Sequence, residues 1–525
     1  MPPPSAVADR ADALGALDAE TFDVVVVGGG ITGAGVARDA ALRGLRVALV
    51  ERDDWASGTS SRSSRLVHGG VRYLEHGHLR LVFEASRERR ILLRTAPHLV
   101  RPLAFTWPVY RGARVPRWKV EAGLTLYDAL SLWRNVAAHR PLSPADVRAA
   151  EPALAARGLT GGARYHDAAT DDARLTLATA LAARDAGATA VNHAAVTALA
   201  FDRRGPARVR LRVRDALGGA EVDVRARAVV NAAGPWSDAV RRLHDADAPA
   251  AVLGAKGVHV AVPAERVGNR GAVTLLAPGD GRVTFVLPGG PHTILGTTET
   301  AAEGGPDDVR ANEADVAYLL AVANHHFPDA RLERADVVSA WAGVRPLAAA
   351  SARAGRGPRR GTGGASREHA IDVDPRGVVT VTGGKFTTYR SMAAAVVDAT
   401  CALLGIARPR APTDRMPLDP GYGVRHARIA AIAATHPALA APVAPGPPYA
   451  GAAFAYAVEA EQAATLADLL VRRAPVAFAT RDAGRAAARV VAPLVAPLLG
   501  WDAAGMARAL AVYDAEAARL FGVDP

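Results

Sequence analysis

The sequence predicts an α/β core followed by a helical C-terminal part. Three observations indicate this. A β-type run, a glycine-rich turn and a helix follow one another near the N-terminus, short β-type runs fill the middle, and helical patterns continue from about residue 406 onward. The length of 525 residues favours about two to four domains, and half of the residues are hydrophobic, as in ordinary globular proteins.

The N-terminal elements are predicted to form a βαβ unit. Residues Val24–Val27 make an uninterrupted β-branched run, which is typical of a buried parallel strand. A glycine-rich turn, residues 28–33, follows it, and Ala34–Gly44 has the pattern of a helix that ends at glycine. A second strand, Val47–Val50, then ends on Glu51.

The turn carries a dinucleotide-binding pattern. Gly28, Gly30 and Gly33 allow a tight turn, a close approach of the backbone to a diphosphate, and close packing of the helix on the strand. The N–H groups at the start of the helix favour a phosphate, and Glu51 is placed to accept hydrogen bonds from ribose hydroxyls. The pattern predicts a dinucleotide site but does not separate FAD from NAD.

A second glycine turn favours a flavin. Gly383–Lys385 follows a predicted strand, Val378–Thr382, and opens a helix that runs to about Leu404. A helix N-terminus at this place would stabilise negative charge on the pyrimidine edge of a reduced flavin. A plain helix cap is the alternative. The turn Asn231–Trp236, which contains Gly234, follows a strand in the same way, with an ordinary αβ turn as its alternative.

The remaining elements are assigned from their periodicity. The predicted strands of the middle region are Arg208–Val213, Val222–Val230, Gly257–Val262 and Val283–Leu287. Helices are predicted at about 79–93 and 118–133. The proline-rich segment Pro409–Pro420 marks a boundary, beyond which the chain is predicted to be helical, as in Ala455–Arg473 and Ala503–Phe521.

Three arginines are candidates for binding a phosphate-bearing alcohol: Arg72, Arg345 and Arg367. A single arginine in so basic a chain is usually a solvated surface residue. Arg72 and Arg345, however, lie among glycine, aromatic and proline residues and not on a charged helix face. Each well-aligned contact between arginine and phosphate contributes about 1.5–3 kcal/mol, so two of them would strongly favour a phosphorylated substrate over the free alcohol.

Two histidines are candidates for a general base. Oxidation of a secondary alcohol requires removal of the hydroxyl proton as hydride leaves carbon, and a neutral imidazole suits this task. His68 and His259 are the candidates, although a lone histidine is more often structural. Lysine is rare, with only three in the chain, and both Lys256 and Lys385 lie beside glycines. Since arginine is the default cation here, a retained lysine suggests a need for a compact ammonium.

The composition excludes several classes of protein and site. The lone cysteine, Cys401, excludes an intrachain disulfide and a multi-cysteine metal site, and no metal site is expected. A membrane span is not expected, because the most apolar window, Val490–Leu499, is short and interrupted by prolines. The net charge of +11 allows a nucleic-acid-binding protein, but the arginines are spread along the chain with few interleaved aromatics, so this class is discounted.

These motifs resemble those of the FAD-dependent glycerol-3-phosphate dehydrogenase family, the aerobic, respiratory type. Blocks similar to the family occur in family order from about residue 20 to 400, and a similar helical tail follows. The blocks are Asp23–Gly35, Thr59–Glu75, Thr170–Leu175, Asn231–Trp236, Lys256–His259, Ile294–Glu299, Trp341–Leu347 and Gly383–Arg390, with Glu459–Ala474 and Leu499–Asp502 in the tail.

The resemblance implies an α/β fold with an FAD-binding Rossmann-like domain, an inserted antiparallel-sheet substrate domain and a C-terminal helical domain. The oxidoreductase core would span residues 20–405 and the helical domain residues 406–525. Within the core, FAD-binding segments are expected at about 20–78, 160–240 and 335–405. Substrate-domain segments are expected at about 79–159 and 241–334.

The resemblance also implies a reaction. The protein would oxidise sn-glycerol 3-phosphate to dihydroxyacetone phosphate by hydride transfer to noncovalently bound FAD, and pass the electrons to a respiratory quinone. The substrate-binding residues would be Arg72, Tyr73, Arg345, Arg367 and Lys385. The catalytic candidates are His68, His259, Arg345 and Lys385. The cofactor-binding residues would be Gly28, Gly30, Gly33, Glu51, Thr59, Ser60, Ser61, Gly234, Gly383, Gly384, Phe386 and Thr387.

Membrane contact is a further implication, with a cytoplasmic protein lying peripherally on the inner face of the cell membrane. The predicted helix near residues 118–133 is compatible with a headgroup interface. Its apolar residues are Trp118, Leu124, Leu126, Leu130 and Trp133, and its flanking cations are Arg111, Arg114, Arg117 and Arg134. A helix buried against its own protein is the competing interpretation.

Two alternative functions stay open on the same scaffold. One is a glycerol-3-phosphate oxidase that uses O₂, and the other is a related FAD-dependent oxidoreductase that acts on an amino or hydroxy acid. The sequence also leaves open which quinone is used and whether the chain forms a homo-oligomer.

Overall fold

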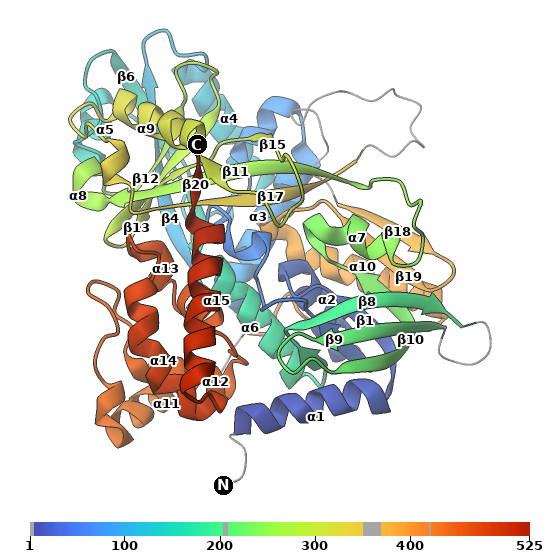
Figure 1. The fold of residues 1–525 in the computed structure, drawn as a ribbon. Coiled ribbons are helices and arrows are strands. Elements are labelled where there is room, and N and C mark those ends of the chain that lie inside the picture. The colour runs from blue at the N-terminus through green and yellow to red at the C-terminus, as the bar shows by residue number, and fades with distance from the viewer. Residues whose placement is uncertain (1–4, 203–207, 350–368, 419–421) are drawn as a thin grey trace.

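The computed structural model describes residues 5–202, 208–349, 369–418 and 422–525. Two sheets form the core, and a group of helices from the C-terminal part lies beside them (Figure 1). The fold is therefore of the α/β class that the sequence predicts, with the helical C-terminal part as a separate layer.

The first sheet is parallel at its centre and contains the N-terminal βαβ unit. Its strand order is β18-β19-β10-β1-β2-β7, and β8 and β9 extend it next to β10. The strands are β1 (Thr21–Val27), β2 (Val47–Val50), β7 (Thr189–Val191), β8 (Ala194–Phe201), β9 (Val209–Asp215), β10 (Glu221–Asn231), β18 (Ala370–Asp374) and β19 (Val378–Thr382).

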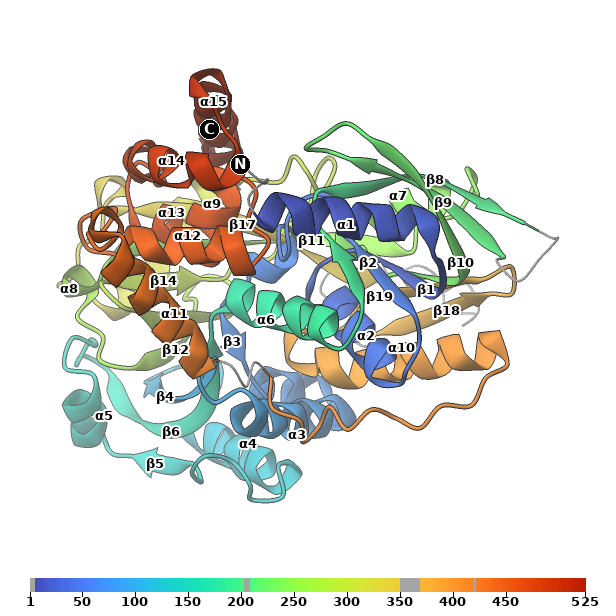
Figure 2. The same ribbon diagram turned by 90° about the horizontal axis from the view of Figure 1, so that it is seen from below.

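Both faces of this sheet are covered, which explains why β1 is apolar at every position of its second half. Val24 and Val26 pack into one hydrophobic cluster, and Val25 and Val27 pack into another on the opposite face. The first face is covered by α2 (Ile31–Leu42), α6 (Asp172–Asp185) and α10 (Tyr389–Leu404), which lie together in Figure 2. The second face is covered by α1 (Ser5–Ala19) and by the β8–β9–β10 meander.

Helix α1 is an element that the sequence analysis did not assign. Its Leu17 is fully buried, and Arg10 is tied to the segments around β7 and β9. The Arg10 guanidinium donates to the Asn192 carbonyl at 2.6 Å and pairs with Asp215 at 2.6 Å. The helix is fixed by contacts with residues far along the chain, so its local pattern gave little indication of it.

The second sheet is antiparallel apart from the pairing of β12 with β4. Its path is β15-β11-β14-β13-β12-β4-β6-β3, with β17 beside β11 and β5 beside β6. The strands are β3 (Leu66–Val67), β4 (Val100–Tyr110), β5 (Arg140–Leu142), β6 (Leu159–Thr170), β11 (Val252–Pro263), β12 (Ala272–Leu276), β13 (Val283–Gly289), β14 (His292–Gly296), β15 (Thr300–Ala301) and β17 (Ser339–Ala348).

Helices pack on both faces of the second sheet as well. One face packs against α9 (Glu313–His326), with α5 (Pro144–Ala150) and α8 (Ala264–Val267) nearby. The other face packs against α3 (Leu79–Thr95), α4 (Arg117–Leu130) and the C-terminal helices. Two short elements complete this part of the chain, α7 (Ser237–Arg242) after β10 and β16 (Ala311–Asn312), which pairs with β20 (Val523–Asp524).

Two long strands from segments expected to bind FAD belong to the second sheet. Both β6 and β17 fall in segments expected to bind FAD, yet they pair within the second sheet, with β4 and β11 respectively. Strand β17 also contacts β19 and the turn Gly234–Trp236, so it carries residues from the second sheet to the edge of the first. This explains how Arg345, near the end of β17, reaches the cavity described below.

The C-terminal part forms the expected group of helices. These are α11 (Tyr422–Thr435), α12 (Gly451–Ala460), a π-helical turn Asp468–Arg473, α13 (Val476–Ala479), α14 (Arg485–Leu499) and α15 (Ala503–Phe521). Their apolar residues join the same hydrophobic cluster as α3, α4 and the second sheet. The part of the chain that the structure describes contains no helix long and apolar enough to cross a bilayer.

The prediction of one continuous helix over Ala455–Arg473 is wrong. Helix α12 ends at Ala460, and Gln462 adopts a left-handed backbone conformation with φ of +56°. A new helical segment then begins, because the Asp468 carboxylate accepts hydrogen bonds from the backbone N–H groups of Ala464 and Thr465. Burial of Asp468 against distant residues decides this break, which the local apolar periodicity did not indicate.

Candidate active site

A cavity of about 440 Å³ lies at the edge of the first sheet where β1, β2 and β10 end, and residues of β17 close it from the second sheet. Most of the predicted cofactor-binding, substrate-binding and catalytic residues line it. They are Gly28, Gly30, Glu51, Thr59, Ser60, His68, Tyr73, Gly234, Arg345, Gly383, Gly384, Lys385 and Phe386. The other predicted cofactor residues lie in elements that adjoin the cavity, Gly33 in α2, Ser61 in the turn Thr59–Ser61 and Thr387 in the turn Phe386–Thr388.

The first glycine turn is packed too closely for side chains. A Cβ on Gly33 would lie 1.8 Å from the Gly28 carbonyl oxygen, and a Cβ on Gly28 would lie 2.7 Å from that of Ala232. Gly28 also has a φ of +110°, which L side chains rarely adopt. At the start of α2 the backbone N–H of Ile31 donates to the Ser60 hydroxyl at 3.0 Å. The turn thus presents bare backbone and a helix N-terminus to the cavity, as a diphosphate requires.

Glu51 is held at the end of β2 by backbone donors. Its carboxylate accepts from the N–H of Gly29 at 2.5 Å and from the N–H of Asp53 at 2.9 Å. Burial raises the pKa of Glu51, and these two hydrogen bonds oppose that shift. Two oxygens offer about four acceptor sites, so the carboxylate can still accept from the hydroxyls of a ribose.

A polar contact at the same end of the cavity was missed in the sequence analysis. Arg52 pairs with Asp307 at 2.6 Å, and the Trp236 indole N–H donates to the other oxygen of Asp307 at 3.1 Å. Asp307 belongs to the segment between β15 and β16, so this contact joins that segment to the end of β2 in the first sheet. Arg52 follows Glu51 directly, but its partner is 255 residues away and no local pattern points to it.

The second glycine turn lies at the other end of the cavity. Gly383 and Gly384 have φ of +73° and +87°, and a Cβ on Gly384 would lie 2.2 Å from Cε of Met392. The turn leads into α10, so a helix N-terminus again faces the cavity. Thr387 holds the neighbouring loop, because its hydroxyl accepts from the backbone N–H of His68 at 3.1 Å.

One cation and two aromatic rings meet at this end, and a second cation, Arg345, lines the same cavity. The Lys385 ammonium lies 3.5 Å from the centroid of the Tyr73 ring, a cation–π contact, and the rings of His68 and Tyr73 stack at 6.4 Å. Arg345 is oriented by a hydrogen bond of 2.9 Å from its guanidinium to the Thr297 hydroxyl. A small anionic molecule in this part of the cavity would therefore meet ammonium, guanidinium, phenol and imidazole groups.

The loop that carries His68 and Tyr73 rests on a buried ion pair. The Asp167 carboxylate pairs with Arg89 and accepts from the Tyr127 hydroxyl at 2.7 Å and from the N–H of Gly69 at 3.0 Å. A Cβ on Gly69 would lie 2.2 Å from the Tyr127 hydroxyl oxygen. The charged cluster beneath the loop therefore leaves no room for a side chain at Gly69.

The two candidate general bases lie in different places. His68 lines the cavity, whereas His259 is buried on β11, stacked on Trp341 at 5.5 Å, with Nε2 at 2.9 Å from the Ser64 hydroxyl. Burial, together with the positive charge of Arg345, lowers the pKa of His259 to about 3. His259 is therefore a neutral imidazole at physiological pH.

Three further predicted residues remain, and the structure describes the side chain of one of them. The Lys256 ammonium pairs with Asp315 at 2.7 Å, on the side of β11 that faces α9. Arg72 lies in the helical turn Val71–His76 next to Tyr73, but its side chain is outside the part that the structure describes. Arg367 is outside the described residues altogether.

A strand–glycine–helix turn with a carboxylate after the next strand defines a protein that binds a dinucleotide at the carboxyl edge of its sheet. The comparisons with known proteins specify the class. Residues 23–399 match the family of FAD-dependent oxidoreductases, and residues 392–506 match the C-terminal domain of alpha-glycerophosphate oxidase.

Individual relatives cover nearly the whole chain. The chain is 39% identical to glycerol-3-phosphate dehydrogenase 2 of Mycobacterium tuberculosis, over 96% of this chain and 90% of the relative. It is 36% identical to a glycerol-3-phosphate dehydrogenase of Synechocystis, over 91% and 93%. The structure of glycerol-3-phosphate dehydrogenase from Bacillus halodurans, complexed with FAD, is similar with a TM-score of 0.76 at 28% identity, covering 98% of this chain and 97% of that one. The chain therefore belongs to the FAD-dependent oxidoreductases, and within them to the glycerol-3-phosphate dehydrogenase family.

The residues of the cavity fit the FAD that this family uses. The glycine turn at α2 suits the diphosphate, Glu51 suits the ribose, and the turn before α10 suits the negative pyrimidine edge of a reduced flavin. The predictions of FAD as cofactor and of the α/β fold class are confirmed.

The Gly33→Ala variant is expected to lose bound flavin. The added methyl group cannot fit 1.8 Å from the Gly28 carbonyl, so the turn must open and the diphosphate site is distorted. The measurement is the ratio of flavin to protein absorbance after purification. Gly123→Ala, at a helical position with nothing within 4 Å of the added carbon, is the control and should keep its flavin. Full flavin content in Gly33→Ala would contradict the assignment of the turn.

The free energy of unfolding of the His259→Gln variant is expected to fall less steeply with decreasing pH than that of the wild type. The folded protein keeps His259 neutral down to about pH 3, while the unfolded chain binds a proton near pH 6.5. Neutral His259 thus makes its full contribution to the free energy of unfolding above pH 6.5. This contribution declines as the pH falls toward 3, by at most about 1.4 kcal/mol per pH unit. Urea unfolding at several pH values measures this, with exposed His436→Gln as the control. The same dependence of the free energy of unfolding on pH in wild type and His259→Gln would refute the prediction.

Proposed function

We propose that the chain oxidises sn-glycerol 3-phosphate to dihydroxyacetone phosphate, with bound FAD as the hydride acceptor, and delivers the electrons to a quinone at a membrane surface. The observation that carries the proposal is that Lys385, Tyr73 and His68 meet at one end of the cavity, which Arg345 also lines. The names of the relatives, which are glycerol-3-phosphate dehydrogenases, support the substrate.

The charge at this end favours a phosphate over a carboxylate or a neutral alcohol. Arg345 offers a planar fork that matches a phosphate, and Lys385 offers a compact ammonium with three donors. Both are held in place before substrate arrives, Arg345 by Thr297 and Lys385 by the Tyr73 ring. Such preorganisation reduces the entropy lost on binding.

Removal of the hydroxyl proton is assigned to His68 in this proposal. Of the two candidates it is the one that lines the cavity, and Thr387 fixes its backbone. A neutral imidazole can accept the hydroxyl proton while hydride leaves the same carbon. FAD, when bound, supplies the hydride acceptor.

An exposed apolar surface around α4 supports membrane contact. We call it the α4 surface. Its exposed members are Trp118, Leu126, Leu132, Trp133 and Val136, with Trp118 exposed by 70% and Trp133 by 63%. Exposed cations occur in the same stretch of the sequence, Arg111, Lys119 and Arg134 among them. Leu124, by contrast, is fully buried, so one face of α4 packs on the protein and the other is free to meet lipid headgroups.

The Arg345→Met variant is expected to keep its FAD and to bind substrate poorly. Loss of one arginine–phosphate contact of about 1.5–3 kcal/mol corresponds to a KM for glycerol 3-phosphate raised about 10- to 150-fold. Anaerobic bleaching of the flavin by glycerol 3-phosphate, glycerol, lactate and glycine measures it, with Arg334→Met, a surface ion-pair residue, as the control.

The same experiment separates the alternatives. Bleaching by lactate or glycine, with none by glycerol 3-phosphate, would show that the substrate is a hydroxy acid or an amino acid. Reoxidation of the reduced enzyme by O₂ as fast as by a quinone would identify an oxidase. Loss of FAD from Arg345→Met in proportion to activity would mean that this arginine supports the fold.

The double variant Trp118→Ser/Trp133→Ser is expected to bind membranes less. Loss of the two indoles removes apolar contacts with the membrane interface. It should lower the fraction of protein that cosediments with phosphatidylglycerol-containing vesicles at least about fivefold. Activity with a soluble electron acceptor should not change. Val512→Ser, which alters an equally exposed apolar residue on α15, is the control. Unchanged cosedimentation of the double variant would exclude the α4 surface as the membrane contact.

A further inference from the structure

The C-terminal helices contact the back of the loops that form the Glu51 end of the FAD cavity. One loop is residues 51–55, which follow β2. The other is residues 190–194, which comprise the end of β7, the two-residue connection and the first residue of β8. Glu51, Asp53 and Ala194 line the cavity itself. Residues of the C-terminal part therefore lie directly behind a cofactor-binding surface.

Gln462 binds both loops at once. Its side-chain carbonyl accepts from the Trp55 indole N–H at 3.1 Å, and its side-chain N–H donates to the Ala190 carbonyl at 2.9 Å. Its backbone carbonyl accepts from the Asn192 side chain at 2.9 Å. The left-handed backbone at Gln462, which ends α12, turns the residue so that it makes these contacts.

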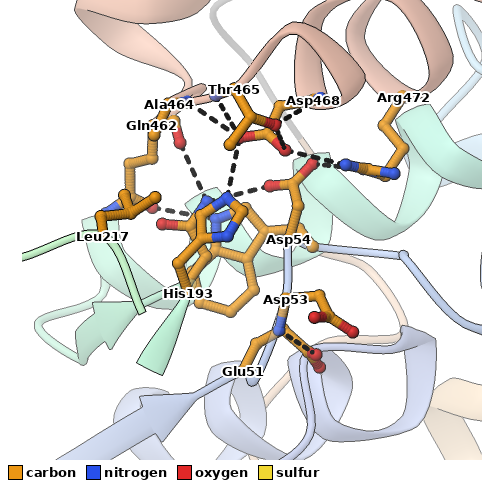
Figure 3. Close-up of polar contacts among 12 residues, drawn as sticks. Glu51, Asp53, Asp54, His193, Leu217, Gln462, Ala464, Thr465, Asp468 and Arg472 are labelled. Carbon is orange, nitrogen blue, oxygen red and sulfur yellow. Dashed lines mark hydrogen bonds and ion pairs between the residues drawn. The ribbon is translucent and has the colours of Figure 1, made fainter. Parts of the chain in front are cut away.

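Asp54 receives two guanidinium groups from the C-terminal part, and Figure 3 shows one of them, that of Arg472, facing its carboxylate. Arg472 donates at 2.6 Å, and Arg473 donates through two nitrogens at 2.6 and 2.9 Å. All three side chains are buried, with Asp54 fully inaccessible. Asn192 supplies a fourth hydrogen bond to Asp54, at 2.9 Å.

His193 joins the other loop to the same cluster. Its Nε2 lies 2.9 Å from the Asp468 carboxylate, which also pairs with Arg472 at 2.8 Å (Figure 3). Burial disfavours a charged His193, but the carboxylates of Asp468 and Asp54 together outweigh burial and raise the pKa of the ring. The backbone N–H of His193 donates to the Asp53 carbonyl, so the two loops are joined to each other as well.

The cluster is an ion-pair network and not a metal site. Asp54, His193 and Asp468 do bring three possible ligand atoms within 4.8 Å of one another. Each carboxylate oxygen of Asp54 and Asp468, however, already accepts at least two hydrogen bonds from protein donors. A cation would have to displace two guanidinium groups that already neutralise these carboxylates.

A π-helical turn makes the double contact with Asp54 feasible. In an α-helix, consecutive side chains point about 100° apart, so two neighbouring arginines do not easily reach one carboxylate. The segment Asp468–Arg473 is wound more loosely, and its last bond joins the Ala474 N–H to the Leu469 carbonyl. Such turns are rare and often occur at functional sites.

The loop that is held in this way positions the first glycine turn. The Trp55 ring packs against Gly29 so closely that a Cβ there would lie 2.4 Å from the ring, and the Ala56 N–H donates to the Gly29 carbonyl at 3.1 Å. Gly29 in turn donates to the Glu51 carboxylate. A shift of residues 53–56 would move both the ribose-binding carboxylate and the turn for the diphosphate.

We propose that Gln462, Arg472 and Arg473 are positioning residues for FAD, so that the C-terminal domain sets the affinity of the cofactor site without touching the cofactor. The domain holds residues 51–55 and 190–194 in the conformation that presents Glu51 and Gly29. Binding of FAD and docking of the C-terminal helices are then thermodynamically linked, since each stabilises the same loop conformation.

The test compares FAD affinity and FAD-dependent stability in the full-length protein. Gln462→Met keeps the length of the side chain and removes its two side-chain hydrogen bonds, and Arg473→Met removes one guanidinium from Asp54. Both variants are expected to raise the dissociation constant of FAD, measured by fluorescence of flavin released on dilution, at least about tenfold. Added FAD should also raise their melting temperature less than it raises that of the wild type. With FAD saturating, KM for substrate and the flavin absorbance spectrum should not change.

Arg485→Met, which removes an ion pair with Asp514 inside the C-terminal helices, is the matched control and should keep the wild-type affinity. Arg473→Lys, which retains the charge, should recover part of the affinity. A purely structural role would lower the stability of the FAD-free and FAD-bound forms equally, leave the dissociation constant within about twofold and overturn the proposal. If Arg473→Met does not fold, Gln462→Met and Arg473→Lys decide the question. The dissociation constant of FAD and the melting temperature are measured without substrate, so these two readouts are independent of the proposed reaction.

Discussion

The parallel pairing of β1 with β2 and β10 is the constraint on which the rest of the molecule depends. This register places Val27 beside both Val50 and Asn231, so three strands end at one edge of the sheet. Parallel strands must be joined by crossovers, and the helices that make them cover the sheet and direct their N-termini toward this edge. The glycine turn, Glu51 and Gly234 meet at the cavity for this reason, although 206 residues separate the first from the last.

The second sheet forms another wall of the cavity, again through the pairing of strands that are far apart in the sequence. The pairing of β17 with β11 sets Arg345 opposite Ala255 and holds its guanidinium near Thr297. Lys385 reaches the same space from the first sheet, on the turn after β19. Residues of both sheets thus line the cavity, and neither sheet alone would supply both cations.

Buried arginines connect the layers of this protein. A basic composition is most simply interpreted as surface charge, but Arg43, Arg89, Arg472 and Arg473 are buried and each pairs with a carboxylate. A planar guanidinium suits such positions because it donates several hydrogen bonds in fixed directions and is weakly hydrated. Removal of one partner from such a pair leaves an uncompensated buried charge, which is why these contacts strongly restrict how the layers can be arranged.

The sequence by itself determined the parts that depend on neighbouring residues: the βαβ unit with Gly28, Gly30, Gly33 and Glu51, strand Val378–Thr382 with its glycine turn, and helix Ala503–Phe521. Each follows from local apolar periodicity and from turns that only glycine can make. The tertiary structure alone decided which candidates share a cavity, the break of the predicted helix at Gln462, and the contacts of Arg52 and Asp54 with partners hundreds of residues away. Hydrogen bonds and ion pairs between distant segments exist only after the sheets and helices have packed, so no local pattern could reveal them.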